Sequence, residues 1–381
     1  MKRSELLYDY PEELVATAPV YPPRVMWIEE SFDVLDGFRN VISKEILWGQ
    51  FLDLFREGDV LVLNDTKVLK CRVFAVDGSE ILFLKKHELQ VSEDFKDSLG
   101  NQNDGEMWEV LFPSKKYKLG DRIQLPQGKE LKLIKKGRPQ IVKSSEPLDA
   151  SYFDQVGELP LPPYIQRARQ ERHNLVQDSA NYQTAWAQKP GSLAAPTASL
   201  HFKHEDLENL KRRGVQVLYV TLHVGLGTFL PITVEDLKDH TMHSEWVEIP
   251  DEVWRQILKA KESGSRVWGL GTTVTRSLES QALGYFKLDQ VHQSWFGFTD
   301  LLIQPGFEFK VIDNLLTNFH QPESTLLALV SAFSNLENVK AVYRKAIDLK
   351  MRLFSYGDLS VWTKIKSSTQ SIKEKGSYER G

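Results

Sequence analysis

Five short clusters of polar side chains contain the residue types that acid–base chemistry needs. Histidine, threonine, asparagine and acidic residues are frequent in them, at positions 64–66, 196–202, 221–225, 240–245 and 317–320. A neutral imidazole or a carboxylate can accept a proton near neutral pH. Each cluster lies beside a predicted strand. Because ligands of open α/β sheets bind beyond the carboxyl ends of the strands, we expect some of these clusters to converge there.

The sequence Gly-Leu-Gly-Thr occurs twice, at 225–228 and 269–272, next to two predicted strands. Glycine at a strand end lets the backbone approach a ligand closely, and the amides that follow can face an anionic group. Two tight turns without a ligand would need the same residues, so both interpretations stay open.

The spacing of His240, His243 and Glu245 would allow metal binding, but we favour acid–base or hydrogen-bonding roles. Their segment is predicted to be a loop leading into a strand, whereas zinc-binding histidine pairs commonly lie one turn apart on a helix. We therefore expect no metal. Cys71 is the single cysteine, which excludes a disulfide framework and a cysteine-based zinc cage.

Length and composition limit the class of protein. A chain of 381 residues with 41% hydrophobic and 26% charged residues fits two or three globular domains and excludes a fibrous or wholly disordered protein. No window of about 18 residues is continuously apolar, so we expect no membrane span. The N-terminal apolar run is too short and too acidic for a signal peptide. Together with the single cysteine, these features predict a cytoplasmic protein.

Helix and strand patterns alternate over both ends of the chain. Apolar residues at helical spacing over 45–55 precede a buried strand at 60–63. Further helices and strands are predicted at 204–213, 215–222, 251–263, 265–270, 272–283, 324–336 and 337–354. Such alternation predicts an α/β fold with a mainly parallel sheet and helices on both faces.

A different pattern interrupts this α/β fold. Six short alternating segments, separated by turn residues, follow one another in about 75 residues, which predicts a small inserted β-barrel domain. We therefore expect a discontinuous α/β catalytic domain at 1–65 plus 157–363 and the barrel domain at 66–156. Two polar segments are expected to be a mobile hairpin tip, at 88–106, and a disordered tail, at 364–381.

The formal charge of −4 conceals an uneven distribution. The segment 112–143 holds ten basic and two acidic residues, a net charge of +8, so the rest of the chain carries −12. Such a basic stretch is a candidate footprint for a phosphate backbone. The solvated surface of a small β domain would have the same composition, so charge alone does not decide between the two.

Long motifs spread over residues 6–362 resemble one enzyme family. They include LVLNDTKVLKCRV, ELPLPPYIQR, NYQTAWAQKPGSLAAPTASLHF, TLHVGLGTFLPI, HTMHSEW, GTTVTRSLES and FSYGD, in this order. Together they are similar to the motifs of the S-adenosylmethionine:tRNA ribosyltransferase-isomerases of queuosine biosynthesis. The architecture implied by this resemblance, an α/β domain with an inserted β-barrel, agrees with the patterns above.

The resemblance implies a specific reaction. Such enzymes transfer the ribosyl part of S-adenosylmethionine to 7-aminomethyl-7-deazaguanine at the tRNA wobble position and rearrange it, which gives epoxyqueuosine and releases adenine and methionine. S-adenosylmethionine is a substrate, and no other cofactor is implied. The expected partners are S-adenosylmethionine and the tRNA anticodon arm, with no membrane, and a monomer is favoured.

The implied chemistry requires a base for a C5′ proton, which the sulfonium acidifies, and an acid for the departing adenine. Catalytic candidates in the matching motifs are His201, His223, His243, Glu245 and His320. Candidates for substrate binding are Asn64, Asp65, Thr66, Tyr182, Thr197, Gly225, Gly227, Thr228, Gly271, Thr272, Arg276 and Asn318. Candidates for tRNA binding are Lys115, Lys116, Lys118, Lys135, Lys136, Arg138, Arg167 and Arg169. The sequence does not assign the individual steps.

Departures from the family motifs leave alternatives open. Lys67 and Asn181 stand where arginine is usual, Ser199 replaces glycine, and Gln321 and Glu323 replace leucine and lysine. A diverged paralogue acting on another modified base is therefore one alternative. A non-catalytic RNA-binding protein is a second. A methyltransferase is a third, although no acidic residue stands at a convincing place after the next strand.

Overall fold

The computed structural model describes residues 1–32, 39–86, 106–229 and 232–363. The chain divides into two compact units: a large unit of residues 1–66, 184–189 and 196–381, and a small unit of residues 67–183 and 190–195. Folding of independent domains with the boundaries expected from the sequence stays a prediction. The expected disordered tail and nearly all of the expected hairpin tip lie outside the described residues.

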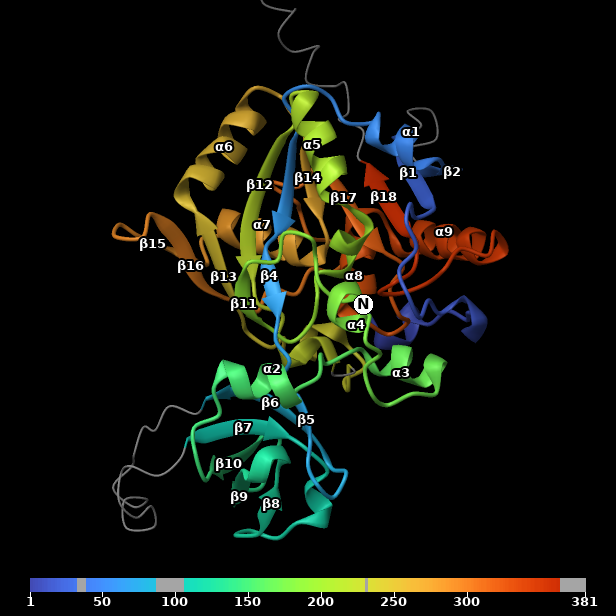
Figure 1. The fold of residues 1–381 in the computed structure, drawn as a ribbon. Helices are drawn as coiled ribbons and strands as arrows, with labels where there is room; N and C mark the ends of the chain where they lie inside the picture. The colour runs from blue at the N-terminus through green and yellow to red at the C-terminus, as the bar shows by residue number, and fades with distance from the viewer. Residues whose placement is uncertain (33–38, 87–105, 230–231, 364–381) are drawn as a thin grey trace, which may run out of the picture. The chain divides into compact units, whose positions relative to one another are not determined.

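The described part of the large unit contains a ten-stranded sheet (Figure 1). The strand order is β15-β16-β13-β12-β3-β14-β17-β18-β1-β2. The strands are β1 Val25–Phe32, β2 Arg39–Ile46, β3 Val60–Asn64, β12 Gln216–Leu222, β13 Glu245–Pro250, β14 Val267–Leu270, β15 Lys287–Asp289, β16 Ser294–Thr299, β17 Asn314–Asn318 and β18 Leu359–Thr363.

The centre of this sheet is parallel, as the sequence predicts, and its flanks differ from the prediction. Strands β12, β3, β14 and β17 run parallel to one another, as do β18 and β1. The other neighbouring pairs are antiparallel. Strands β15 and β16, for example, are joined by four residues, whereas a parallel crossover needs a dozen or more. The complete sheet is therefore mixed.

Helices cover both faces of the sheet centre. Every residue of β3 is buried, and Leu61 and Leu63 pack in one hydrophobic core with residues of α1 and α5, such as Phe51 and Leu207. Successive residues of a strand point to opposite faces, so Val60 and Val62 face the other side, where α7 packs against β3 (Figure 1). The helices of the large unit are α1 Trp48–Leu52, α5 His204–Arg212, α6 Asp251–Glu262, α7 Thr272–Ala282, α8 Thr325–Phe333 and α9 Leu336–Asp348.

Glycines end two of these helices where the sequence predicts. Gly214 and Gly264 follow α5 and α6 with φ angles of 82° and 79°. Residues with a side chain rarely adopt this left-handed conformation, so glycine is favoured at these helix ends. Each glycine precedes a strand of the parallel centre, β12 or β14.

The small unit contains a curled antiparallel sheet whose six described strands match the six predicted segments. The order is β5-β6-β7-β10-β9-β8. The strands are β5 Arg72–Phe74, β6 Glu80–Lys86, β7 Met107–Leu111, β8 Arg122–Gln124, β9 Glu130–Lys135 and β10 Gln140–Ser144. The N–H of Val76, just after β5, donates to Gln124 O at 2.9 Å, so the two edges of the sheet approach each other. The sheet is thus a half-barrel.

Arg72 of β5 connects this half-barrel to other segments of the small unit. Its buried guanidinium contacts Glu80 at 2.8 Å and Glu158 at 3.0 Å and donates to Arg172 O. The backbones of Arg72 and Glu158 also exchange two hydrogen bonds. The unit further contains α2 Ala150–Val156, α3 Pro163–Arg169 and α4 Asp178–Asn181, and it includes most of the paired strands β4 Thr66–Val68 and β11 Lys189–Ser192.

Candidate active site at the ends of the central strands

The carboxyl ends of four adjacent strands form one edge of the large unit, which we call the strand-end edge. Because β12, β3, β14 and β17 run parallel in that order, the residues that follow them share this edge (Figure 1). Neighbouring strands are about 4.8 Å apart, so the edge spans roughly 14 Å from β12 to β17. Three of the predicted polar clusters, 64–66, 221–225 and 317–320, lie at the ends of these strands.

Asn64, the last residue of β3, holds β3 and β12 together through its side chain. Its Nδ2 donates to Leu222 O at 3.0 Å, and its Oδ1 accepts from the N–H groups of Leu222 and Thr66, both at 3.1 Å. Asn64 is fully buried. These contacts fix the backbone from which Asp65, Thr66 and His223 extend.

Asp65 lies beside Thr221 at the strand-end edge. The hydroxyl of Thr221 donates to Asp65 Oδ1 at 2.6 Å, and both residues are buried. Burial raises the pKa of Asp65, although the bond from Thr221 and the charge of Lys189 act in the opposite direction. Lys189 itself pairs with Glu248 at 2.6 Å.

His223, directly after β12, has one ring nitrogen engaged. Its Nδ1 lies 2.7 Å from Thr66 Oγ1, and its ring stacks on Trp246 with centroids 5.0 Å apart and planes inclined by 16°. Burial lowers the pKa of His223, and the charge of Lys189 lowers it further. Nε2 has no hydrogen-bond partner within the described ranges, and the side chain is partly exposed. His223 therefore has the geometry of a general base.

Glu245 and Arg276 form a buried ion pair next to the loop that follows β12. Oε2 of Glu245 contacts Nη1 of Arg276, and Oε1 accepts from Gly225 N–H at 3.0 Å. The Nε of Arg276 donates to Leu301 O at 3.1 Å. Both side chains are at least nine-tenths buried. The pair is electrically compensated and joins α7 to the first of the two Gly-Leu-Gly-Thr segments.

His243 packs against the same loop. A Cβ atom on Gly227 would lie 2.9 Å from the Cβ of His243, so the close approach requires glycine there. Gly227 belongs to the 3-10 helix η7, Leu226–Phe229, and the side chain of His243 is exposed. The side chain of Thr228 lies outside the part of the chain that the structure describes.

His201 and Asn318 form a separate buried cluster at the end of β17. Asn318 Nδ2 donates to His201 Nε2 at 3.0 Å and to Phe354 O at 2.9 Å, and Thr197 Oγ1 donates to Asn318 Oδ1 at 3.4 Å. Burial lowers the pKa of His201 to about 3, assisted by the charge of Arg352. The ring is thus neutral, with its proton on Nδ1.

His320 is held on three sides. Its Nε2 lies 2.8 Å from Thr317 Oγ1, its N–H donates to Tyr343 OH at 3.0 Å, and its carbonyl accepts from Tyr8 OH. We call Tyr8 and Tyr343 the tyrosine pair. Burial lowers the pKa of His320 to about 3. These contacts fix the position of His320, two residues after Asn318, and engage its Nε2.

Gly271 connects two strands of the edge to α7. It has a φ of 94°, and its N–H donates to Leu316 O at 2.8 Å. No side chain caps α7 at this residue. Thr272 is buried, and a Cβ on Gly271 would lie 3.8 Å from Ala198 of the 3-10 helix η6, Thr197–His201. The second Gly-Leu-Gly-Thr segment therefore ends at the N-terminus of α7.

Thr221 lies in the predicted polar cluster 221–225, but neither it nor Trp246 nor the Lys189–Glu248 pair is among the predicted site residues. Residues 246 and 248 alternate with buried residues of β13, so Trp246 and Glu248 lie on the same face of the strand. This alternation is visible in the sequence and could have identified both residues. Nothing local connects Thr221 to Asp65, because the two residues are 156 positions apart.

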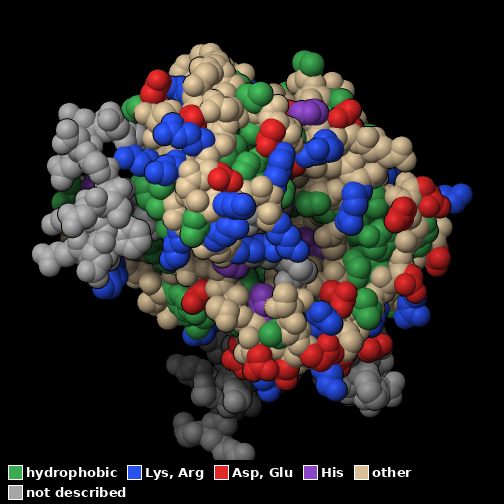
Figure 2. Space-filling view, turned by 90° about the horizontal axis from the view of Figure 1, so that it is seen from below, with side chains coloured by type: hydrophobic (Ala, Val, Ile, Leu, Met, Phe, Trp, Pro, Cys, Tyr) green, Lys and Arg blue, Asp and Glu red, His purple; other side chains and the backbone are tan. Residues whose placement is uncertain are grey.

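The candidates for tRNA binding in the small unit differ in accessibility. Arg169 makes two bonds to buried Asp178, at 2.7 and 2.9 Å, and Lys116 pairs with Asp77 at 2.7 Å. Tyr182, a candidate for substrate binding, is buried. Lys116 is nevertheless exposed, as are the remaining tRNA candidates: Lys115, Lys118, Lys135, Lys136, Arg138 and Arg167. Figure 2 shows Lys and Arg side chains gathered near the middle of the face it presents.

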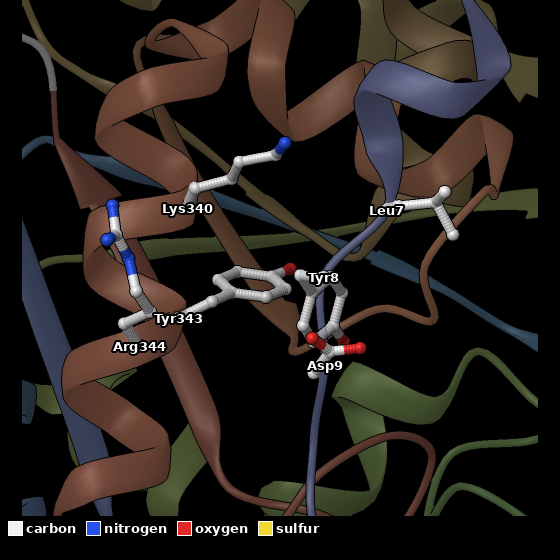
Figure 3. Close-up of a pocket in the computed structure, with 6 residues that line it drawn as sticks. All are labelled: Leu7, Tyr8, Asp9, Lys340, Tyr343 and Arg344. Atoms are coloured by element: carbon white, nitrogen blue, oxygen red, sulfur yellow. The ribbon is translucent and has the colours of Figure 1, made fainter.

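A hollow of about 290 Å³ lies between the N-terminal segment and α9 of the large unit (Figure 3). The rings of the tyrosine pair meet edge to face there, with centroids 5.3 Å apart. Asp9, Lys340 and Arg344 also line it. The hollow therefore lies next to the tyrosine pair, whose hydroxyl groups bond to the backbone of His320.

None of the helices among the described residues is both long and apolar enough to cross a membrane. Within the same ranges, no three His, Cys, Asp or Glu side chains form a group suited to a metal ion.

A parallel sheet centre with polar residues at its carboxyl edge is typical of α/β proteins, whose ligands commonly bind at the strand ends. The family model described as "Queuosine biosynthesis protein" matches residues 3–361. The chain therefore belongs to the queuosine biosynthesis protein family.

Two relatives and one crystal structure are similar to this chain over most of its length. An S-adenosylmethionine:tRNA ribosyltransferase-isomerase of Halothermothrix orenii is 40% identical over 364 residues, which cover 94% of this chain and 98% of that protein. The protein of the same name from Staphylococcus aureus is 38% identical over 363 residues, with the same coverage. The crystal structure of an S-adenosylmethionine tRNA ribosyltransferase from Thermotoga maritima is 28% identical, with a TM-score of 0.49, and the match covers 94% of this chain and 99% of that one.

Proposed function

We propose that this chain is an S-adenosylmethionine:tRNA ribosyltransferase-isomerase. It transfers and isomerises the ribosyl part of S-adenosylmethionine onto 7-aminomethyl-7-deazaguanine at the tRNA wobble position, with release of adenine and methionine. The observation that carries this proposal is the 40% identity to a protein of that name across 94% of the chain. S-adenosylmethionine is consumed as a substrate.

His223 is the proposed base. Its Nε2 takes a C5′ proton of S-adenosylmethionine, and the carbon keeps the electron pair beside the sulfonium that stabilises it. The lowered pKa of His223 supports this role, because the imidazole is then neutral at physiological pH. Departing adenine needs a proton on a ring nitrogen. One residue can therefore act first as base and then as acid.

The other candidates divide by their contacts. Glu245 and Arg276 compensate each other's charge, so we assign the pair to positioning the loop at Gly225. Asp65 is proposed to accept a ribose hydroxyl. His243, which is exposed, is proposed to accept a proton from the aminomethyl group.

His201 and His320 are proposed to have a structural role, in which they hold Asn318 and Thr317 of β17 in place. Their ring nitrogens Nε2 already bond to Asn318 and Thr317. A pKa near 3 makes either imidazole a weak base at neutral pH.

The tRNA anticodon arm is proposed to bind through basic residues of the small unit. A wobble base in a single-stranded loop can be turned out into a pocket while Lys and Arg hold the backbone. The protein is proposed to act as a monomer. We expect the protein in the cytoplasm, together with its tRNA.

One assay tests the function against its rivals. The protein is incubated with S-adenosylmethionine and tRNA that carries the aminomethyl precursor, and free adenine is measured. We expect stoichiometric release of adenine and methionine. Formation of S-adenosylhomocysteine would instead indicate a methyltransferase, and tRNA binding without either product would indicate a binding protein.

A further inference from the structure

Three neighbouring strands of the large unit, β12, β13 and β16, carry ring side chains at matching positions (Figure 1). The N–H of His223, directly after β12, donates to Trp246 O at 3.0 Å, and Trp246 is in register with Phe298 of β16. Residues directly opposite each other on antiparallel strands lie on the same face, with Cβ atoms about 4.5–5.5 Å apart. We call His223, Trp246 and Phe298 the aromatic row.

The aromatic row lies on the solvent side of the sheet. Val247, which follows Trp246, is buried, and a Cβ on Gly297 would lie 3.1 Å from the ring of buried Phe286. Successive residues of a strand point to opposite faces, so the row points away from this packed side. Phe298 is 63% exposed, and Phe296, two residues earlier on the same face, is 38% exposed. Large apolar side chains that are exposed together mark binding surfaces.

Trp246 lies between His223 and Phe298 in this row. The imidazole of His223 stacks on one face of the indole, with planes inclined by 16°. The opposite face of the indole therefore points to the β16 side of the row. Phe298 makes no ring contact with any residue that the structure describes, so the two rings do not stack on each other. Both rings thus offer π surface to a planar group.

Both proposed substrates contain nucleobases, and the exposure of the row distinguishes them. Small-molecule sites bury most of the ligand surface, whereas Phe298 is largely exposed. An open aromatic surface suits an unpaired base of a nucleic-acid strand that continues on both sides. Lys287 of β15, opposite Phe296, is exposed and has no ion pair within the described ranges, so it can contact a phosphate of that strand. Glu248, on the same face, is compensated by Lys189.

We propose that Trp246 and Phe298 of the aromatic row stack an unpaired base of the tRNA anticodon loop. This inference rests on the proposed function and identifies a contact of its RNA substrate on the large unit. Because Trp246 also stacks on His223, the bound base is held beside the imidazole that acts on S-adenosylmethionine. Every base has a π face, so such stacking contributes affinity and position and little sequence recognition.

The first test uses the full-length variant Phe298→Leu, which keeps an apolar side chain and removes the ring. We expect its affinity for tRNA to fall about 5- to 100-fold, as for the loss of one base stack, and Phe298→Trp to retain the affinity. The factor should be equal at about 0.1 and 0.3 M salt, because losing a phosphate contact, unlike losing a stack, changes the salt slope. Tyr285→Leu, which removes a ring that is 41% exposed outside the row, is the matched control and should bind tRNA as the wild-type protein does.

The second test uses the wild-type protein and anticodon stem-loop RNA in which one unpaired base at a time is replaced by an abasic residue. One position should weaken binding to the wild-type protein and leave the affinity of Phe298→Leu unchanged. Such non-additivity shows that the ring and that base interact directly. If every abasic position weakens binding to both proteins by equal factors, the inference is wrong.

The remaining outcomes separate this inference from the proposed function. If wild-type protein releases adenine and Phe298→Leu binds tRNA with wild-type affinity, the inference is wrong and the function stands. A loss of S-adenosylmethionine affinity without a loss of tRNA affinity would assign the row to adenine. A change in oligomeric state by light scattering, with tRNA affinity unchanged, would assign it to a second copy of the chain. Both results would overturn the inference, whereas a wild-type protein that releases no adenine would overturn the proposed function itself.

Discussion

The hydroxyl of Thr66 lies 2.7 Å from Nδ1 of His223 and engages that ring nitrogen, which leaves Nε2 for a substrate. A neutral imidazole has one protonated nitrogen and one acceptor nitrogen. When Thr66 accepts a hydrogen bond from Nδ1–H, Nε2 carries the free lone pair and can act as a base. The base is thus oriented by a residue from a different strand.

Replacing Thr66 with valine should remove this orientation without changing the shape of the side chain much. We expect the rate of adenine release to fall about tenfold, part of the 10²- to 10⁴-fold that a general base supplies. Thr66→Ser keeps the hydroxyl and should retain most of the rate. Equal rates for the valine and serine variants would show that the contact does not orient the base.

Removing the imidazole should have a larger effect. We expect His223→Ala to lose about 10²- to 10⁴-fold in adenine release while still binding S-adenosylmethionine and tRNA. His292→Ala, which removes an exposed histidine between β15 and β16, is the control and should keep wild-type activity. An unchanged rate in His223→Ala would assign the base to another residue.

The pH dependence of the reaction follows from the lowered pKa of His223. The base acts only when it is unprotonated, and burial moves its pKa below the ordinary value of 6.5. The acidic limb of kcat/KM should therefore lie below pH 6.5, with activity falling as the pH decreases through the lowered pKa. If the acidic limb of kcat/KM lies at or above pH 6.5 and disappears in His223→Ala, the pKa of His223 is not lowered.

Two histidines whose pKa values are lowered to about 3 should make the protein sensitive to acid. Burial holds the pKa of His201 and His320 near 3, whereas an unfolded chain titrates near 6.5. Below pH 6.5 the unfolded chain binds these protons and the folded chain does not, so the free energy of unfolding decreases as the pH falls. The slope is up to about 1.4 kcal/mol per pH unit for each histidine, down to about pH 3.

Denaturant unfolding between pH 7 and 4.5 measures this slope. The variant His201→Gln should have a shallower dependence than the wild-type protein, by up to one proton, whatever its stability at pH 7. An identical slope would mean that His201 protonates equally in both states.

The Glu245–Arg276 pair predicts a non-additive pattern of stability. Glu245→Gln leaves the buried guanidinium uncompensated, which should cost about 3–5 kcal/mol in the free energy of unfolding. The double variant E245Q/R276M removes both charges and should recover part of that loss. Additive effects in chemical denaturation would show that the two groups do not interact.

Arg72 should be essential to the stability of the small unit. Arg72→Met keeps much of the side-chain volume but leaves Glu80 and Glu158 without their buried partner, so we expect a loss of about 3 kcal/mol or more. Limited proteolysis should then cut the small unit first. Arg122→Met, which also breaks an ion pair but at an exposed site, should have a small effect on stability.

The local elements were predictable because their signals are local. The glycines that end α5 and α6 follow from their position after a helical pattern. The buried strand β3 and the six strands of the small unit follow from residue spacing and turn residues. The antiparallel flanks of the large sheet were not predictable in this way. The pairing of β17 with β18, for example, depends on a partner about 40 residues later and carries no direct signal in either strand.

The site residues were partly predictable for a similar reason. The types and positions of Asp65 and His223 indicate chemistry at strand ends. Their partners Thr221 and Thr66 follow only from the register of β3 against β12, and the pairing of Glu245 with Arg276 depends on where α7 packs. The sequence alone therefore gives a list of candidates. The fold then distinguishes His223, whose Nε2 is available, from the charge-compensated pair Glu245–Arg276 and from buried His201.

The tyrosine pair has a consequence for biosynthesis of the chain. Tyr8 and His320 are 312 positions apart, so their contact forms only after the ribosome has translated past His320. The segment around Tyr8 must therefore wait for the residues that follow β17 before it can bond to them. A nascent chain that stops before β17 lacks this contact and also lacks one strand of the strand-end edge.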